Sequence, residues 1–459
     1  MKFWASKSRR FITPLNLPII SFATLILVGT LLLLTPFAAN GPPLKPVDAL
    51  FTAASATCVT GLVVVDTGSK LSLFGQSVVL VLIQCGGLGI MTFSTVLILL
   101  MGGRFSFLSR SVIQDTFTHR RDIRLPSLVQ HVVLFTLLLE GAGAALLFIR
   151  FSEMYPAGKA LYYSVFHAVS AFCNAGFCLY SNSFIDFQSD FLVSLTLCGL
   201  IIMGGLGFLV LLELKSFVFS SNAWQPRRRL SLHSKLVLST SALLLVAGTL
   251  VFLVFDWRDS MDNLSTGAKL LASFFQSVTA RTAGFNTLDF SKMANVSLVF
   301  TLFLMFVGAA SGSTGGGIKV NTLGVLFALS RSRFLGRQTT SVFRRTISPE
   351  TVGRAISVFT LSVVVIYVAT MALLTSELGP TAHLETRGLF LEMLFEVVSA
   401  FGTVGLSMGI TTQLGVLGKL IIVMVMFTGR LGPLSLAVAL SAKEDRSKYE
   451  YAEENVMIG

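Results

Sequence analysis

Four short turns, each carrying a glycine, recur along the chain after amphipathic stretches that are too short to cross a membrane. They read Val59-Thr60-Gly61-Leu62, Asn174-Ala175-Gly176-Phe177, Thr282-Ala283-Gly284-Phe285 and Thr403-Val404-Gly405-Leu406, and their glycines are 115, 108 and 121 residues apart. Backbone carbonyls gathered on one axis can replace the water around a bare cation. The turns therefore predict a single pore built by fourfold pseudo-repetition, although any one turn alone would suit an ordinary surface loop.

The composition indicates whether these turns lie in water or in a membrane. Of 459 residues, 53 % are hydrophobic and 13 % charged, against about 25 % charged in soluble domains. Long runs almost without charge indicate an all-α polytopic membrane protein. We expect eight spans, near residues 17–38, 72–101, 128–150, 190–219, 232–255, 294–330, 355–376 and 415–441. The first is taken as a span rather than a signal peptide, because no small-residue cleavage site follows it.

The net charge of +12 is distributed unevenly between the loops. Twenty-three of the 35 Lys and Arg residues fall in alternate loops, namely the N-terminus, Arg104–Arg124, Lys215–Lys235, Arg331–Arg354 and Lys443–Lys448, while acids occupy the intervening ones. This is the positive-inside pattern, and it argues against a nucleic-acid partner. It predicts a multi-pass protein of the inner (plasma) membrane with both termini in the cytoplasm, its basic loops near anionic lipid headgroups.

Each glycine turn is preceded by a half-buried segment that differs from the full spans. These segments, at 46–57, 159–172, 265–280 and 386–401, have about 12 to 16 residues and fall short of the ~30 Å hydrocarbon core. Their C-terminal dipoles would favour a cation at the turns, and Phe51, Phe166, Phe274 and Phe395 lie upstream. The repeat unit is then span, half-helix, turn and span (M1–P-loop–M2), which divides the chain into residues 1–125, 126–230, 231–350 and 351–459.

A second glycine cluster follows each turn by about one span. Gly86–Gly89 and Gly204–Gly207 are interpreted as sites of close helix packing. The third cluster, Gly308–Lys319, cannot be a stable helix because each glycine costs ~1 kcal/mol relative to alanine. Irregular backbone at that depth is tolerated only inside protein or beside a watery cavity. We interpret it as an intramembrane gate, with a packing kink as the alternative; the residues assigned are Gly308, Ala309, Ala310, Ser311, Gly312, Ser313, Thr314, Gly315, Gly316 and Gly317.

The gate stretch superficially resembles a nucleotide-binding P-loop. That motif needs lysine directly after glycine and then Ser or Thr, whereas Ile318 precedes Lys319 and Val320 follows it. The ATP-site interpretation is rejected.

Two arginines lie at unexpected depth. Arg430, in the eighth span, is expected to face the gate loop and donate to its carbonyls, with a structural salt bridge as the alternative; Lys319 is expected to reach cytoplasmic water. Arg281 is expected to point away from the axis and bond backbone or a carboxylate behind the turns, with Glu392 and Glu396 as candidates. Asp48 is expected to act similarly near the first half-helix.

Other classes of function find little support. The five cysteines form no C-x-x-C pair and the five histidines are scattered, so no metal or redox site is expected, and no organic cofactor. The spans lack a nucleophile–base or carboxylate pair, which argues against an enzyme. A coupled secondary transporter usually has two repeats and acids in its spans, where only Glu140 and Glu213 qualify here.

The segments Phe274–Thr287 and Gly308–Lys319 resemble the potassium-transporter superfamily that includes bacterial Trk and Ktr and plant HKT proteins. Eight spans without an extra N-terminal pair look more like the membrane subunit of Ktr systems. The resemblance implies one pore per protomer, a homodimer, a cytoplasmic ring of RCK-type nucleotide-binding subunits, and K⁺ uptake that is often stimulated by Na⁺. It also implies that Gly61, Gly176, Gly284 and Gly405 are the filter glycines, and that glycine rather than serine at position 61 favours K⁺.

The predicted selectivity filter binds K⁺ through the carbonyls of three residues in each turn, namely Val59, Thr60, Gly61, Asn174, Ala175, Gly176, Thr282, Ala283, Gly284, Thr403, Val404 and Gly405. None of the turns reads T-V-G-Y-G, so fewer ordered carbonyl rings and weaker discrimination are expected. A Na⁺ pathway on the same scaffold therefore stays open.

Overall fold

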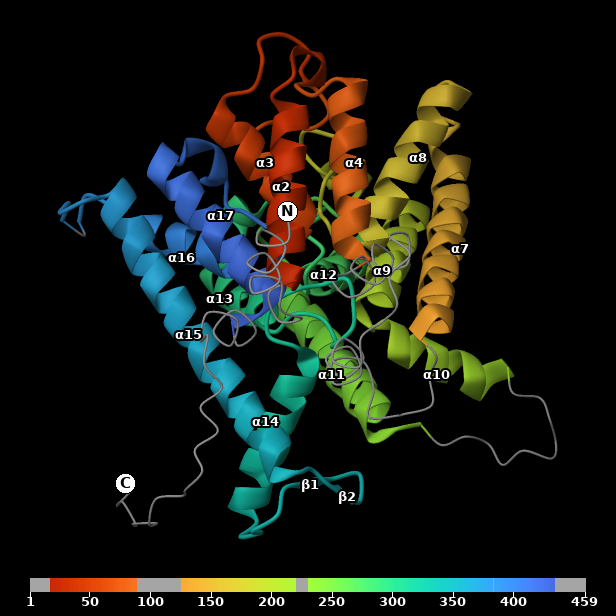
Figure 1. Ribbon diagram of the computed structural model, residues 1–459, viewed down its shortest axis with the longest axis vertical. Coiled ribbons are helices and arrows are strands. Elements are labelled where there is room, and N and C mark those ends of the chain that lie inside the picture. Colours follow the sequence, from red (N-terminus) through yellow and green to blue (C-terminus); the bar gives the residue numbers. More distant parts are fainter. Residues whose placement is uncertain (1–16, 89–124, 220–229, 383, 434–459) are drawn as a thin grey trace, which may run out of the picture.

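The computed structural model describes residues 17–88, 125–219, 230–382 and 384–433 (Figure 1). The regular secondary structure of this part of the chain is helical apart from one small hairpin. The α-helices are α2 (Leu17–Leu33), α3 (Pro46–Cys58), α4 (Leu73–Gly87), α7 (Leu125–Phe151), α8 (Ala157–Phe172), α9 (Phe191–Gly205), α10 (Phe208–Phe219), α11 (Leu232–Phe255), α12 (Thr266–Thr279), α13 (Asn295–Phe306), α14 (Val320–Phe334), α15 (Pro349–Glu377), α16 (Leu389–Gly402) and α17 (Val416–Leu431). Short 3₁₀ turns lie at Pro36–Ala38, Ile185–Phe187, Phe290–Lys292 and Thr411–Gln413.

The four predicted half-helices are present as α3, α8, α12 and α16, and each ends within two residues of its turn. Their bounds agree with the prediction to within three residues. Local chemistry explains the starts of α3 and α12: Pro46 has a backbone already suited to the first helical position, and the Ser265 side chain accepts from the Ala268 N–H. These two positions are thus encoded locally.

Among the described residues, three helices are long and apolar enough to cross a membrane, namely α11, α15, and α7 over Gln130–Phe151, and the bent pair of α9 and α10 is a fourth if it forms one span. The helices α2, α4 and α13 are apolar but shorter. Helix length in the described residues therefore leaves the count of eight spans a prediction. The ends of the spans predicted at 72–101 and 415–441, and the basic segments 2–10, 104–124 and 443–448, lie outside the described residues.

The span predicted at 190–219 is not one straight helix. Helices α9 and α10 meet at an angle of 102°. Gly207 adopts φ +85°, which glycine accepts without steric cost. The Phe208 N–H then donates to the carbonyl of Gly312 in the distant glycine-rich loop (3.1 Å) instead of continuing the helix. The glycines of this cluster thus form a bend as well as a packing contact.

The predicted span 294–330 is broken as expected. Helix α13 ends at Phe306 and α14 begins at Val320. The two ends of the break approach each other through a parallel bridge between Val307 and Ile318. The glycine-rich stretch between them is therefore a loop held at both ends.

One small hairpin departs from the all-α prediction. Strand β1 (Ser341–Val342) pairs with β2 (Arg345–Thr346) in antiparallel register. Phe343 and Arg344 join the strands with φ of +49° and +61°, the signs that a two-residue type I′ turn requires. The hairpin lies beyond the end of α14, at the bottom of Figure 1.

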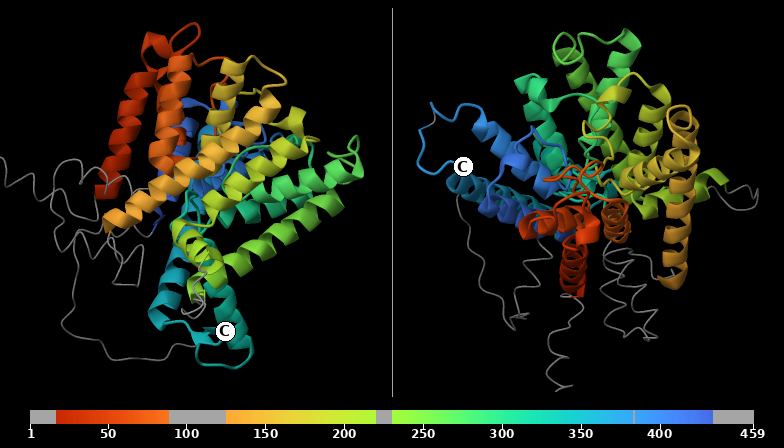
Figure 2. Two further views of the ribbon diagram at one scale, coloured as in Figure 1. Left: turned by 90° about the vertical axis from the view of Figure 1, so that its right-hand side faces the viewer. Right: turned by 90° about the horizontal axis from the view of Figure 1, so that it is seen from above.

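The helices are arranged around a centre in chain order. Seen from above, the colours pass around the middle of the molecule from red through yellow and green to blue (Figure 2, right). Helix contacts follow the same circle: α4 packs on α8, α9 on α12, α13 on α16, and α17 returns to α3. The last quarter of the described chain therefore lies against the first, and the half-helices all lie within this circle.

Candidate functional site

The four turns share an unusual backbone conformation. Each has two residues with positive φ separated by one with negative φ: the first is Val59, Asn174, Thr282 or Thr403, at φ between 49° and 75°, and the second is the glycine, between 70° and 91°. Positive φ is strained for β-branched residues such as Val59 and Thr403, and it persists only where the surroundings fix it. Alternating signs of φ allow successive carbonyls to face one side.

A hydroxyl near the end of each half-helix bonds its own turn. Ser55 Oγ accepts from the Gly61 N–H (3.1 Å) and donates to the Leu62 carbonyl (2.7 Å). The equivalent bonds are Ser170 Oγ to the Phe177 carbonyl (2.8 Å), Thr279 Oγ1 to the Phe285 carbonyl (2.5 Å), and the Gly405 N–H to Ser399 Oγ (3.1 Å). The short-range sequence thus fixes how each turn leaves its helix.

The turns contact one another in a closed circle. A Cβ built at Gly61 would lie 2.5 Å from the carbonyl oxygen of Ala175, and one at Gly176 would lie 2.8 Å from that of Ala283. At Gly284 it would meet the Val404 oxygen at 2.3 Å, and at Gly405 the Thr60 oxygen at 2.2 Å. Only glycine permits this approach. The twelve residues assigned from the sequence to an ion-binding filter are thus brought together around one point.

The half-helices that end at this circle are buried at equivalent positions. Phe51, Phe166 and Phe395 are fully buried, as is Phe275. From the sequence, Phe274 was expected at this position of the third half-helix, but Phe274 is only partly buried. The equivalent residue is shifted by one to Phe275, because the third turn has one residue fewer between its hydroxyl and its glycine than the other turns have. Four helix C-termini directed at one point give a negative electrostatic potential there, which suits a cation.

The predicted gate loop lies against the circle of turns. A Cβ at Gly315 would lie 2.2 Å from Thr282 Oγ1, and one at Gly316 would lie 2.3 Å from Thr403 Oγ1. The loop is also bonded to α9 and α8: the Ala310 N–H donates to the Gly205 carbonyl (3.0 Å), and Thr314 Oγ1 to the Phe172 carbonyl (3.2 Å). Its polar backbone is therefore satisfied by protein.

Two cationic side chains hold the same loop. Arg430 is buried, and its guanidinium donates to the carbonyls of Thr314 and Gly86. The expected contact between Arg430 and the loop is thus present, and the carbonyl of Gly86 at the end of α4 is an additional partner. Lys319 Nζ donates to the Gly315 carbonyl (2.6 Å), a contact that the sequence did not predict, and because the residue is only partly buried its access to cytoplasmic water stays a prediction.

The arginine beside the third turn points away from the other turns. Arg281 Nη2 donates to Ser241 Oγ on α11 (3.0 Å) and Nη1 to the Ser241 carbonyl (3.4 Å). Its predicted backbone partner exists, but Glu396 is not its partner, because that carboxylate accepts from Ser407 and Thr411. Asp48 instead forms an ion pair with Lys419 on α17 (2.7 Å).

One acidic group lies in the segment that follows the first turn. Asp66 accepts from the Ser69 N–H (2.8 Å). Partial burial alone would raise the pKa of this carboxyl, but hydrogen bonds from Ser181 and Ser69 outweigh it and hold the pKa below its ordinary value. Asp66 is therefore anionic at neutral pH, five residues beyond Gly61.

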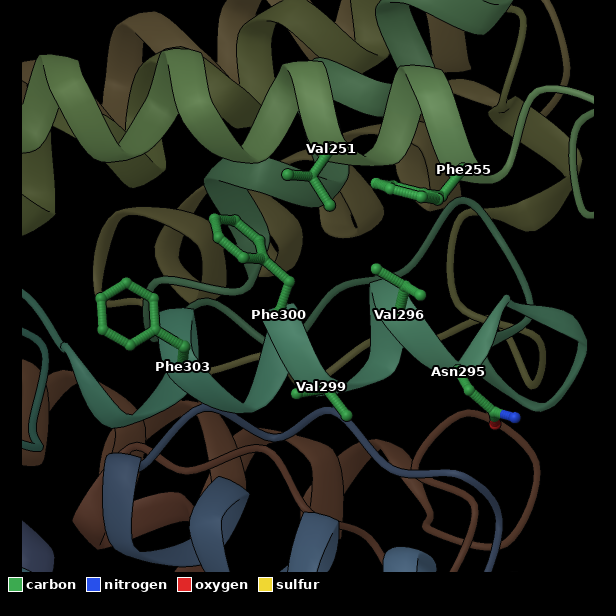
Figure 3. Close-up of a pocket in the computed structure, with 7 residues that line it drawn as sticks. All are labelled: Val251, Phe255, Asn295, Val296, Val299, Phe300 and Phe303. Atoms are coloured by element: carbon green, nitrogen blue, oxygen red, sulfur yellow. The ribbon is translucent and has the colours of Figure 1, made fainter.

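One apolar hollow on the outside of the molecule is unrelated to the turns. It has a volume of about 490 Å³ and lies between α11 and α13, lined by Val251, Phe255, Asn295, Val296, Val299, Phe300 and Phe303 (Figure 3). An almost wholly apolar lining gives a cation no ligands. Among the described residues, no group of three His, Cys, Asp or Glu side chains is placed to hold a metal ion either.

The chain is similar in sequence and in fold to known cation transport proteins. A model of the TrkH family, described as cation transport protein, matches residues 6–451. The Ktr system potassium uptake protein B of Bacillus subtilis is 38 % identical over 97 % of both chains. The potassium/sodium uptake protein NtpJ of Enterococcus hirae is 36 % identical over the full length of both. The crystal structure of the potassium transporter TrkH from Vibrio parahaemolyticus matches 92 % of this chain and 83 % of its own, with a TM-score of 0.70 and 19 % identity.

Fold and sequence together define the class: an all-α polytopic membrane protein that transports ions and is not an enzyme. The chain belongs to the TrkH family of cation transport proteins. This agrees with the resemblance found in the sequence.

Proposed function

We propose that this chain is the membrane subunit of a K⁺ uptake system and that its four glycine turns form the selectivity filter. The observation that carries the proposal is the closed circle in which the glycine of each turn abuts the carbonyl of the next. In this scheme a K⁺ ion sheds water at the carbonyls of the twelve filter residues and moves down its electrochemical gradient. The membrane potential supplies ~2.3 kcal/mol per charge per 100 mV, so no ATP is needed.

The four-repeat organisation, with boundaries near 125, 230 and 350, belongs to the same proposal. Its support is the cyclic packing of each span on the next half-helix. The loop Gly308–Gly317 with Arg430 is the proposed gate. Its support is the contact of Gly315 and Gly316 with the threonines of the third and fourth turns.

Regulation and assembly are further parts of the proposal. Stimulation by Na⁺, a homodimer and a cytoplasmic ring of RCK-type nucleotide-binding subunits are proposed on the resemblance to Ktr systems. Among the relatives at 38 % identity is the Ktr system potassium uptake protein B of Bacillus subtilis. With both termini in the cytoplasm, the basic segments would face such a ring.

A second candidate is a pathway that also carries Na⁺. NtpJ, named as a potassium/sodium uptake protein, matches the full chain at 36 % identity. The four turns lack the T-V-G-Y-G sequence, which weakens the expected discrimination.

Cation uptake in a bacterium deficient in K⁺ uptake tests these candidates. Cells expressing the chain, with and without a co-expressed regulatory subunit, are compared for growth at low K⁺ and for uptake of K⁺, Rb⁺ and Na⁺. Growth rescue with competition by Rb⁺ supports the K⁺ pathway. Uptake of Na⁺ without rescue would favour the second candidate, and no uptake of any of the three ions would contradict both.

A further inference from the structure

The half-helices share one more position that the proposed function has not used. Each fully buried phenylalanine is followed by a polar residue, three positions before the hydroxyl that bonds the turn. The four residues at this position are Thr52, His167, Gln276 and Glu396, and all are buried, the last three completely. A buried polar group is costly unless it is hydrogen-bonded, so its partners indicate why it is there.

Glu396 bonds the segment that leaves the fourth turn. Thr411 Oγ1 donates to one carboxyl oxygen (2.6 Å) and Ser407 Oγ to the other (2.9 Å). Ser407 Oγ in turn accepts from the Gly409 N–H (3.0 Å). Because Ser407 lies two residues beyond Gly405, the carboxyl group fixes the backbone just past the proposed filter.

His167 and Gln276 make equivalent contacts beyond the second and third glycine turns. His167 Nε2 accepts from the Leu179 N–H (3.1 Å), three residues beyond Gly176, while Nδ1 lies 2.8 Å from the Tyr163 carbonyl and so carries the proton. The Gln276 amide, oriented with its oxygen toward the donors, accepts from the N–H groups of Thr287 (3.2 Å) and Leu288 (2.9 Å). These residues lie three and four positions beyond Gly284.

At the first turn, the residue at the equivalent position does not bond the segment beyond the glycine. Thr52 Oγ1 donates to the Asp48 carbonyl of its own helix (2.8 Å). Thr52 is therefore a natural comparison for the other three residues: its side chain is polar and buried, but it does not bond the segment that follows the glycine.

We propose that His167, Gln276 and Glu396 are positioning residues that set the ion selectivity of the filter. Each turn is held at its glycine or one residue beyond it by the Ser or Thr hydroxyl of its half-helix. At three of the four turns, His167, Gln276 or Glu396 holds a second point that begins two or three residues beyond the glycine. A glycine turn restrained at both points cannot collapse readily around an ion smaller than K⁺, whereas a turn released at the second point can. This inference rests on the proposed assignment of the turns as the filter.

Gln276→Met tests the proposal, because methionine has nearly the same length and no strong acceptor. The measurement is the concentration of Na⁺ that halves Rb⁺ uptake in the K⁺-uptake-deficient strain expressing the full chain. We expect about a tenfold lower inhibitory concentration, the change for losing a hydrogen bond worth about 1.4 kcal/mol. Gln276→Glu keeps an acceptor oxygen, as the fourth quarter does naturally, and should stay within about twofold of the parent.

Thr52→Val is the matched control and should also leave the Na⁺ concentration within about twofold of the parent. Gly284→Ser is measured in the same assay, because it distinguishes failure of the positioning role of Gln276 from failure of the filter assignment. Parental selectivity in Gln276→Met with lost selectivity in Gly284→Ser would overturn the positioning role and leave the filter intact. Parental selectivity in both would overturn both. If Gln276→Met does not reach the membrane, Glu396→Leu, with Glu396→Gln as its conservative partner, is judged by the same outcomes.

Discussion

At the scale of single residues, the site depends on backbone conformation more than on side-chain chemistry. Gly284 adopts φ +82° and lies so close to Val404 that an added Cβ would be 2.3 Å from its carbonyl oxygen. Both features exclude a side chain. In the proposed filter, the oxygen displaced by that side chain would be one of the K⁺ ligands.

We therefore expect Gly284→Ser to weaken K⁺ uptake or its selectivity over Na⁺ by about tenfold, since a shift of one carbonyl costs a ligand interaction on the order of 1.4 kcal/mol. Gly158→Ser is the control, because no atom lies within 4 Å of a Cβ built in that first turn of α8. Rb⁺ uptake with Na⁺ as competitor measures both. Normal affinity and selectivity in Gly284→Ser would argue against the filter assignment.

At the scale of elements, two interrupted helices meet at one loop. The bend between α9 and α10 and the break between α13 and α14 are joined by bonds from Phe208 and Ala310 across the loop. Irregular backbone at membrane depth has to be satisfied by protein in this way. The loop is thus held by hydrogen bonds rather than by a helix, which is the kind of element that can open.

Deleting Gly312–Gly315 is expected to raise K⁺ flux by about fivefold or more, the lower end of the range for coupling between two states. The deletion removes the loop carbonyls that Arg430, Lys319 and Phe208 bond. Initial rates of Rb⁺ uptake, normalised to the protein in the membrane, provide the measurement. Unchanged flux would leave the loop as a packing kink.

Arg430→Lys is a smaller change at the same contact. Lysine keeps the charge but cannot present the planar fork that reaches two carbonyls at once. We expect flux to change in the same direction as in the deletion and by less. A fall in flux at unchanged expression would contradict the gating role of Arg430.

At the scale of the whole molecule, the circle must be closed between the first and last quarters. Helix α17 packs on α3, and the ion pair of Lys419 with Asp48 joins them. Both side chains are about five-sixths buried, with 15 % and 17 % exposed. Removing one partner of a pair in this position leaves the other as an unpaired and largely buried charge, which is costly.

Asp48→Asn or Lys419→Gln alone should lower the free energy of unfolding by about 1–2 kcal/mol, between the values for surface and buried pairs. The double variant should lose less than the sum, because the two share one interaction. Thermal unfolding in detergent measures all three proteins. Strict additivity would show that the pair does not help close the circle.

Short-range patterns in the sequence were enough to predict the half-helices, the glycine turns and the break at Gly308–Lys319. Each depends on local properties: segment length, helix propensity, and residues that tolerate positive φ. The expected contact of Arg430 with the loop followed from the cost of a charge in the membrane. These inferences needed no knowledge of which helices are neighbours.

The features that the sequence did not predict depend on contacts between residues far apart in the chain. The bend at Gly207 depends on a donor to Gly312, more than 100 residues away, and the hydrogen bond of Lys319 depends on how its loop folds back. The partners of Arg281 and Glu396 could not be chosen from the sequence, because several polar groups of suitable chemistry lay at similar depth. By itself the sequence determined where the chain turns; only the tertiary structure decided which carbonyl each glycine meets, because that contact joins residues more than 100 positions apart.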